Sequence, residues 1–419
     1  VRIGFLTWFW PGEYMINSGG LPRIIEVSLL LFVCMQLAAG DISLTKILFI
    51  LEKDKLFLIL FVIFLYLLVQ PFFLELFSLV IAPTAKGVIR GSVIMPMVAY
   101  LSASEYRWTK NQVKMTVAIL LLIGALHAVA IIYPAIFPNY MIQSSYHHYE
   151  SIKTLQEGLN EGIRPSGFWD RSTQAATFMT IIICLSVAFF MYSKSRLCRL
   201  VTLLTLALSI VALSATSQRI QFVASSVIIF IAIIKTFTAN RKKSNSQIVL
   251  ASFLFLLFIF LNAMYPFIFI SRDVGIQSIS SDYRTEVVWP SYIKFIIREP
   301  SVLFFGAGFV CDALDEFGKP MYLMHAHNEF LGWIASTGFL ISGLYIYAFI
   351  IYYRRARLLS YSKNESIKLF SSFAKFLLIS LFIICLAESP MQQEPIAILV
   401  FFIAGMISSL YYSESSNPS

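Results

Sequence analysis

Long apolar runs are the feature that most restricts the fold of this chain. Several of them approach or exceed the ~20 residues that an α-helix needs to cross about 30 Å of hydrocarbon. Backbone amides in lipid must find hydrogen-bond partners within their own segment, so such runs form helices. The composition agrees, because 58% of the 419 residues are hydrophobic and only 13% are charged, far fewer than in soluble domains. The sequence predicts an all-α, polytopic membrane helix bundle.

We expect a single integral membrane domain, residues 1–419, with about 11 to 12 spans. Eleven spans are expected at residues 24–40, 56–82, 87–103, 113–133, 173–192, 198–214, 218–238, 247–270, 328–353, 367–387 and 393–411. The weaker run from Ile3 to Trp10 would belong to a twelfth. The first apolar run lacks the small-residue cleavage site of a signal peptide, so we expect no cleavable leader.

Short basic connections set the expected orientation. With these spans they fall on one side of the membrane, which the positive-inside rule assigns to the cytoplasm. The net charge of +9 therefore reflects topology, and no nucleic-acid partner is expected. These connections hold Lys194, Arg196 and Arg199, then Arg241, Lys242 and Lys243, then Arg354, Arg355 and Arg357.

Two long loops, residues 134–172 and 271–327, then lie on the outer face. Long loops in a compact protein usually carry function. In the second loop, YRTEVVWPSYIKFII (Tyr283 to Ile297) is amphipathic and is expected to lie along the outer leaflet. FFGAGF (Phe304 to Phe309) predicts a tight, closely packed turn.

MHAHNEFLGWIASTGFLISGLYIY, which starts at Met324, places polar residues at the head of a span. Asn328 is placed to cap the first helical turn. His327 precedes it at the lipid–water boundary, where a neutral imidazole can act as a general base near pH 7. The alternative is an interfacial histidine without a chemical role, next to a capping asparagine.

Guanidinium groups collect on the same face. They grip phosphate in a bidentate fashion, which suits an anionic, lipid-linked substrate. Each has a simpler explanation as well: a side chain at a span entrance can snorkel to water, and those in the loops can pair with Asp170, Asp282 or Glu286. These arginines are Arg219, Arg284, Arg164 and Arg171.

No cofactor or metal site is predicted. The chain has no Walker loop, HExxH, GxSxG or Rossmann glycine fingerprint. Its five cysteines form no CxxC pair. The carboxylates of DALDE (Asp312 to Glu316) are expected on a loop surface.

Three stretches together resemble the bacterial O-antigen ligase/polymerase family. HNEFLGWIASTGFLISGLYIY resembles the helix that a His-Asn pair opens in that family. DYRTEVVWPSYIKFIIREPSVLFFGAGF is similar to its loop of an arginine, an aromatic-rich helix and a Gly-x-Gly turn. TSQRIQFVASSVIIF is similar to its Ser-Arg helix, with Gln218 inserted between Ser217 and Arg219.

The resemblance implies a class C glycosyltransferase of the bacterial inner membrane, multi-pass, whose site faces the periplasm between two long periplasmic loops. Its donor would be a glycan on undecaprenyl pyrophosphate, and its acceptor a second glycan or a lipid A core sugar. Arg219 and Arg284 would hold the pyrophosphate without a metal, and His327 would assist attack by the acceptor hydroxyl. Arg164, Arg171 and Asn328 would contact substrate. Membrane lipids and a chain-length regulator are the other expected partners.

Two reactions share this chemistry. A polymerase joins lipid-linked repeat units, whereas a ligase moves the finished chain onto lipid A core. We favour the polymerase, because both outer loops are long and bear arginines, as two similar lipid-linked substrates would require. A transporter of lipid-linked sugars is the alternative from another class, but it would carry charges in the middle of its spans.

Overall fold

The structure of the protein is a computed structural model. It describes residues 50–76, 93–136, 166–167, 169, 172–216, 218–239, 288–298, 300–308, 312–314, 320–322 and 326–416. The expected spans at 24–40 and 247–270 and most of the loop 134–172 lie outside these residues.

Helices dominate the described part of the chain, as the sequence predicted. The long helices are α5 (Lys55–Leu76), α8 (Lys110–Ile136), α10 (Ser172–Tyr192), α11 (Arg196–Ala215), α12 (Arg219–Ala239), α17 (Glu329–Leu359), α18 (Glu365–Cys385) and α19 (Glu394–Ser416). The shorter elements are α7 (Met95–Glu105), α15 (Trp289–Arg298), α16 (Pro300–Phe305), η5 (Pro390–Gln392) and the antiparallel strands β1 (Asp312–Leu314) and β2 (Pro320–Tyr322).

Six of the described helices are long and apolar enough to cross a membrane: α8, α10, α11, α17, α18 and α19. Hydrophobic side chains remain exposed along their outer surfaces, for example Leu122 and Leu126 on α8 and Leu200 and Leu204 on α11. In water such a surface would be unfavourable, whereas lipid accepts it. The protein is therefore a polytopic helical membrane protein.

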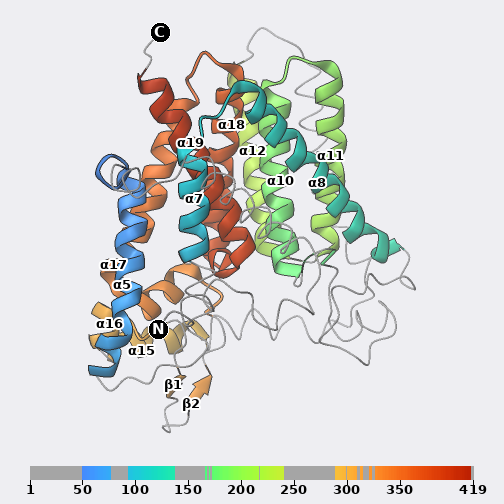
Figure 1. Ribbon diagram of the computed structural model, residues 1–419. Helices are drawn as coiled ribbons and strands as arrows, with labels where there is room; N and C mark the ends of the chain where they lie inside the picture. Colours follow the sequence, from blue (N-terminus) through green and yellow to red (C-terminus); the bar gives the residue numbers. More distant parts are fainter. Residues whose placement is uncertain are drawn as a thin grey trace, which may run out of the picture.

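The long helices run in both directions through the bundle, and its two ends carry different elements (Figure 1). The lower end in Figure 1 carries the starts of α10, α12 and α17 together with α15, α16 and the β-hairpin. The upper end carries the starts of α11 and α18 and the end of α19. The described parts of the two expected outer loops thus lie at one end, as predicted from the order of the spans.

One helix boundary differs from the expectation. For the span expected from residue 87, the structure describes only residues from 93 onward, where α7 begins at Met95. α17 continues to Leu359, so Arg354, Arg355 and Arg357 are helical residues rather than parts of a connection. The assignment of Arg355 to a basic loop was wrong, because its side chain is only 8% exposed and pairs with Asp54.

The helices form two groups with α18 between them. α5, α7, α17 and α19 pack on one side, and α8, α10, α11 and α12 on the other (Figure 1). α7 and α19 lie in close contact at Gly405, where a Cβ atom would lie 2.3 Å from the carbonyl oxygen of Tyr100. The absence of a side chain at Gly405 therefore sets the spacing of this helix pair.

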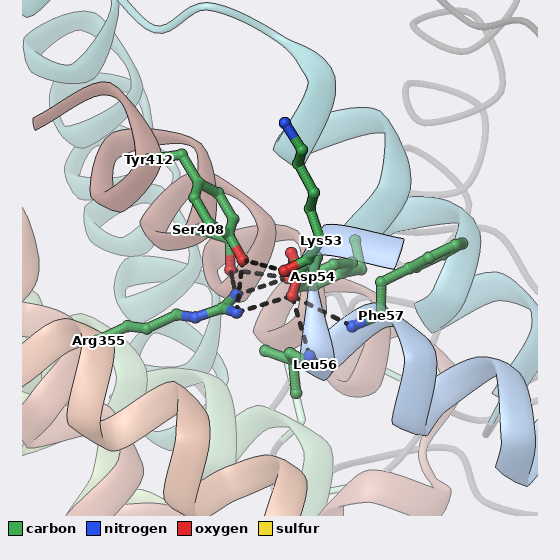
Figure 2. Close-up of polar contacts among 8 residues, drawn as sticks. Lys53, Asp54, Leu56, Phe57, Arg355, Ser408 and Tyr412 are labelled. Atoms are coloured by element: carbon green, nitrogen blue, oxygen red, sulfur yellow. Dashed lines mark hydrogen bonds and ion pairs between the residues drawn. The ribbon is translucent and has the colours of Figure 1, made fainter. Parts of the chain in front are cut away.

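A buried ion pair joins four of these helices at the upper end (Figure 2). Arg355 of α17 donates to Asp54 Oδ1 at 2.8 Å and to Ser408 Oγ of α19 at 2.6 Å. Tyr100 of α7 donates to Asp54 Oδ2 at 2.5 Å. Asp54 also accepts from the backbone N–H of Leu56 at 2.9 Å, so it caps the start of α5.

Candidate functional site

Asn328 begins the helix on which the candidate site is built. Its Oδ1 accepts a hydrogen bond from the backbone N–H of Leu331 at 3.0 Å, which confirms the predicted N-cap of α17. Its Nδ2 donates to the carbonyl of Leu386 at 3.0 Å. Asn328 thus ties the start of α17 to the segment after α18, and a contact between Asn328 and substrate stays a prediction.

His327 precedes this cap in an uncommon backbone conformation, with φ at 47°. Residues other than glycine rarely adopt the left-handed region, and such residues concentrate at functional sites. The chain is held on both sides of it, by the cap at Asn328 and by Trp289 of α15, whose Nε1–H donates to the carbonyl of Ala326 at 2.9 Å. These neighbours fix the direction of the imidazole.

The imidazole of His327 contacts a buried carboxylate. Its Nδ1 lies 3.3 Å from Glu388 Oε2, and the two side chains are 32% and 6% exposed. Glu388 follows the end of α18, so the pair joins the start of one spanning helix to the end of the next. The geometry places an oriented imidazole at the surface with its carboxylate partner behind it.

A second carboxylate fixes the first turn of α17 to η5. Glu329 is 1% exposed. Its Oε1 accepts from Trp333 Nε1 at 2.6 Å, and its Oε2 accepts from the backbone N–H of Met391 at 3.1 Å. Both oxygens are therefore occupied by the protein, which indicates that Glu329 positions the helix and does not contact a substrate.

α17 is broken at Gly338, where φ is 78° and ψ is 169°. The sequence predicted a continuous span here, and that expectation was wrong. The residues before the break, 329–337, form a short helix that Figure 1 shows turning away from the rest of α17. A break in a spanning helix leaves carbonyls without their usual partners, and these must be satisfied locally.

The Gly-Ala-Gly turn after α16 supplies the partners that the break requires. The backbone N–H of Ala307 donates to the carbonyl of Ala335 at 2.8 Å, and that of Gly308 donates to Ser336 at 2.9 Å. Gly306 and Gly308 have positive φ values of 69° and 85°, as expected for a tight turn of glycines. The prediction that FFGAGF forms a tight turn is confirmed over its described residues.

Neither Gly306 nor Gly338 has room for a side chain. A Cβ on Gly306 would lie 2.3 Å from the carbonyl carbon of Ser336, and one on Gly338 would lie 2.2 Å from the carbonyl oxygen of Phe304. The turn and the break are thus in direct backbone contact. Phe304 and Phe305 lie on the turn side of this contact, and Ser336 lies on the helix side.

α15 confirms that the predicted amphipathic segment contains a helix. Val288, Tyr292 and Ile296 face the protein, where they pack beneath α17. Ile293 and Ile297 are exposed. α15 covers Trp289–Arg298, and residues 283–287 of the expected segment lie outside the described residues. The contact of α15 with a leaflet stays a prediction.

Arg219 begins α12 at the same end of the bundle as His327. Its side chain is exposed. Buried polar contacts hold this helix against α10: Gln218 Nε2 donates to Ser172 Oγ at 3.0 Å, and Ser225 Oγ donates to Thr180 Oγ1 at 3.3 Å. Arg219 is therefore the first residue of a helix, and its position at a membrane entrance stays a prediction.

Three of the predicted site residues, Arg164, Arg171 and Arg284, lie outside the described residues, as does His325. Their roles stay predictions. Within the described part of the chain, no group of three His, Cys, Asp or Glu side chains lies close enough together to hold a metal ion.

Sequence reasoning missed two residues that support the site. Glu388 is an acidic residue placed between the end of a span and Pro390, at the end of the bundle that faces outward by the predicted topology. Gln70 is an amide inside an apolar helix, and it contacts the break in α17. Both residues could have been singled out from the sequence, because a polar residue inside or at the end of a span needs a hydrogen-bond or charge partner.

Residues 204–346 match a protein family model described as O-antigen ligase. This match covers less than half of the chain and supports a relationship to the O-antigen ligase/polymerase family. No curated protein matches the chain in a sequence comparison.

The O-antigen ligase match runs from within α11 to beyond the break in α17. It therefore contains Arg219, the Gly-Ala-Gly turn and His327. Gln70 contacts the site from α5, and Glu388 contacts it from the end of α18. Both residues lie outside the matched residues. The family match supports an enzyme of the ligase and polymerase type in general terms.

Proposed function

We propose that the protein is a membrane glycosyltransferase that polymerises undecaprenyl-pyrophosphate-linked repeat units of O-antigen or a related surface polysaccharide. The site would face the periplasm from the inner membrane. The observation that carries the proposal is the contact of His327 with Glu388, at the start of a broken helix and at the end of the bundle that carries Arg219.

The contact between His327 and Glu388 supports a role for the imidazole as a base. A carboxylate accepts hydrogen bonds and does not donate them, so Nδ1 of a neutral His327 carries the proton that points to Glu388. Nε2 is then the nitrogen whose lone pair can accept a proton. An acceptor hydroxyl that attacks the anomeric carbon would lose its proton to Nε2, and the bond from that carbon to the pyrophosphate oxygen would break.

The leaving group in this reaction is undecaprenyl pyrophosphate, which departs with increased negative charge. We assign its stabilisation to Arg219 and to Arg284, with Arg164 and Arg171 as further substrate contacts. Guanidinium groups donate paired hydrogen bonds to phosphate oxygens and stay charged at all relevant pH values. On this assignment no metal takes part, and a lipid-linked glycan or lipid A core provides the acceptor hydroxyl.

A pH–rate profile combined with donor binding tests the role of His327. If the imidazole is a base, activity falls on acidification, and His327→Ala abolishes transfer but still binds donor. If a protonated His327 holds the pyrophosphate instead, activity falls as pH rises and the alanine variant binds donor weakly. Full activity of His327→Ala would refute both roles.

Deletion of the protein in its host separates a polymerase from a ligase. Loss of a polymerase leaves lipopolysaccharide core with a single repeat unit, whereas loss of a ligase leaves bare core. Transfer by the purified protein in proteoliposomes, with lipid-linked glycan extracted from the deletion strain, excludes a transporter. Retained polymer in the deletion strain would contradict the proposal, and a chain-length regulator is expected to alter only its length distribution.

A further inference from the structure

We infer that Gln70 of α5 is a positioning residue for the proposed transfer reaction, because it fixes the break in α17 and with it the direction of His327. The inference rests on the proposed function. It adds α5 to the site. This helix lies outside the residues matched to the O-antigen ligase family.

The side-chain amide of Gln70 holds both sides of the contact between the turn and the break. Its Nε2 donates to the carbonyl of Ser336 at 2.6 Å and to the carbonyl of Phe305 at 2.8 Å. The amide group has two N–H donors, so both are used. Gln70 is 3% exposed, so its amide is largely shielded from water.

These bonds add a further donor to two carbonyls that the helix ladder does not satisfy, since Ser336 also accepts from the backbone N–H of Gly308. In an unbroken helix the carbonyl of Ser336 would accept from the backbone four residues later, but the conformation of Gly338 prevents this. Tyr66, one turn earlier on α5, donates its hydroxyl to the same carbonyl of Phe305. α5 therefore presents two side chains on one face to the broken segment.

The position of the break controls the position of His327. The short helix 329–337 connects the two, and at 1.5 Å per residue His327 lies roughly 14 Å from Ser336. A rotation of about 4° at the break would move the imidazole by about 1 Å. Displacements of that size can lower a rate by up to about 100-fold when a catalytic group must meet a bound substrate.

A second anchor at the far end of the same helix pair provides a matched control. Tyr100 donates to Asp54 at the start of α5, and Asp54 binds Arg355 of α17. Loss of the Tyr100 hydroxyl removes the buried hydrogen bonds that link α7 to Asp54 and to Arg355 of α17, without touching the break. Tyr100→Phe should therefore lower stability without lowering turnover per folded molecule.

The decisive experiment compares Gln70→Leu, Gln70→Glu, Tyr100→Phe and His327→Ala in proteoliposomes. The donor is lipid-linked glycan extracted from cells that lack the protein, and rates are expressed per folded molecule. We expect Gln70→Leu to lower the maximal rate by about 10- to 100-fold with little change in donor KM. Tyr100→Phe should keep the wild-type maximal rate.

Gln70→Glu gives a signature that a loss of stability would not produce. An ionised carboxylate at this position only accepts hydrogen bonds and would repel both carbonyls, whereas a protonated carboxyl can donate one. The rate of Gln70→Glu relative to wild type should therefore rise as pH falls. This variant also keeps the inference testable if Gln70→Leu does not fold.

The outcomes separate this inference from the proposed function. One set of results would overturn the inference and leave the proposed function standing. In it, His327→Ala is inactive, Gln70→Leu keeps the wild-type maximal rate, and the rate of Gln70→Glu relative to wild type does not change with pH. Equal losses of maximal rate in Tyr100→Phe and Gln70→Leu would also overturn it, because the effect would then be general to the helix pair. A fully active His327→Ala would overturn the proposed function first.

Discussion

At the scale of single residues, the structure gives the histidine that precedes α17 a carboxylate partner that the sequence did not reveal. An isolated imidazole at a lipid–water boundary is ambiguous, but His327 has a buried carboxylate at 3.3 Å and a constrained backbone. A side chain that is held in this way has a defined direction. The two residues should therefore act as a unit.

Glu388→Gln tests this unit. The amide keeps the size of the side chain but removes its charge and allows the imidazole to adopt the other tautomer. We expect transfer to fall on the order of 10- to 100-fold, less than the loss of about 100-fold or more in His327→Ala. The measurement is turnover with extracted lipid-linked donor.

A double-variant cycle provides the control for Glu388. In the His327→Ala background, Glu388→Gln should have no further effect on turnover, because the carboxylate acts through the imidazole. Additive losses would show that Glu388 acts independently of His327.

Arg219→Ala should lower transfer by about 30- to 1000-fold while the protein still inserts, because one charge-assisted phosphate contact is lost. Arg219→Lys should restore only part of the rate, since an ammonium cannot form the planar paired contact. Arg196→Ala is the matched control, an exposed arginine at the first residue of α11 and at the opposite end of the bundle. Equal losses of transfer in Arg219→Ala and Arg196→Ala would show that Arg219 contributes only to membrane topology and does not contact the substrate.

At the scale of elements, the broken helix decides where the site lies. α17 would carry His327 along the direction of the bundle if it were continuous. The positive φ of Gly338 instead lets residues 329–337 turn, and the Gly-Ala-Gly turn binds the carbonyls that this exposes. Three segments that are distant in sequence, α5, the turn and α17, meet at this point.

Gly338→Ala should therefore damage the protein severely, because a Cβ would meet the backbone of Phe304 and the residue would be held at positive φ. Gly343→Ala on the same helix is the control, since nothing lies within 4 Å of the Cβ position. We expect Gly343→Ala to leave thermal stability in detergent within about 0.5 kcal/mol of wild type. Similar melting temperatures for the two variants would contradict the interlocked geometry.

How far sequence reasoning reached differs from element to element. Apolar length located the six spans that the described residues show, and the N-cap at Asn328 and the turn at Gly306 followed from local chemistry. The break did not follow, since a glycine within an apolar run is compatible with a continuous helix, and only the turn that binds it reveals the difference. Gln70, Asp54 and Glu388 were missed for the same reason: their partners lie far away in sequence, at Ser336, Arg355 and His327.

At the scale of the whole molecule, orientation is the property that the proposed reaction most depends on. Cysteine substitutions at exposed positions can test it in a background without native cysteines. We expect a membrane-impermeant reagent added from outside to label Arg298→Cys in α15 and to miss Tyr361→Cys between α17 and α18, since the positions lie at opposite ends. The reverse pattern would invert the topology and place the site at the cytoplasmic face.

The buried pair at the upper end should dominate the stability of the helix group around α5. Arg355→Met would leave Asp54 as an unpaired buried carboxylate, which typically costs about 3–5 kcal/mol. Asp54→Asn added to Arg355→Met should recover part of this loss, because the amide is neutral and can still cap α5. Thermal unfolding in detergent measures both. A double variant that is less stable than Arg355→Met would show that the charge of Asp54 is satisfied elsewhere.

The distance of this ion pair along the chain has a consequence for biogenesis. Asp54 and Arg355 are 301 residues apart, so at about 5 to 20 residues per second a ribosome takes roughly 15 to 60 s to make the second partner after the first. Throughout that interval α5 lacks both the arginine that neutralises its cap and the carbonyl of Ser336 that Gln70 binds. The first spans to enter the bilayer therefore stay loosely associated until the last ones are made. In a nascent chain that stalls before α17, α5 remains accessible to insertases and proteases.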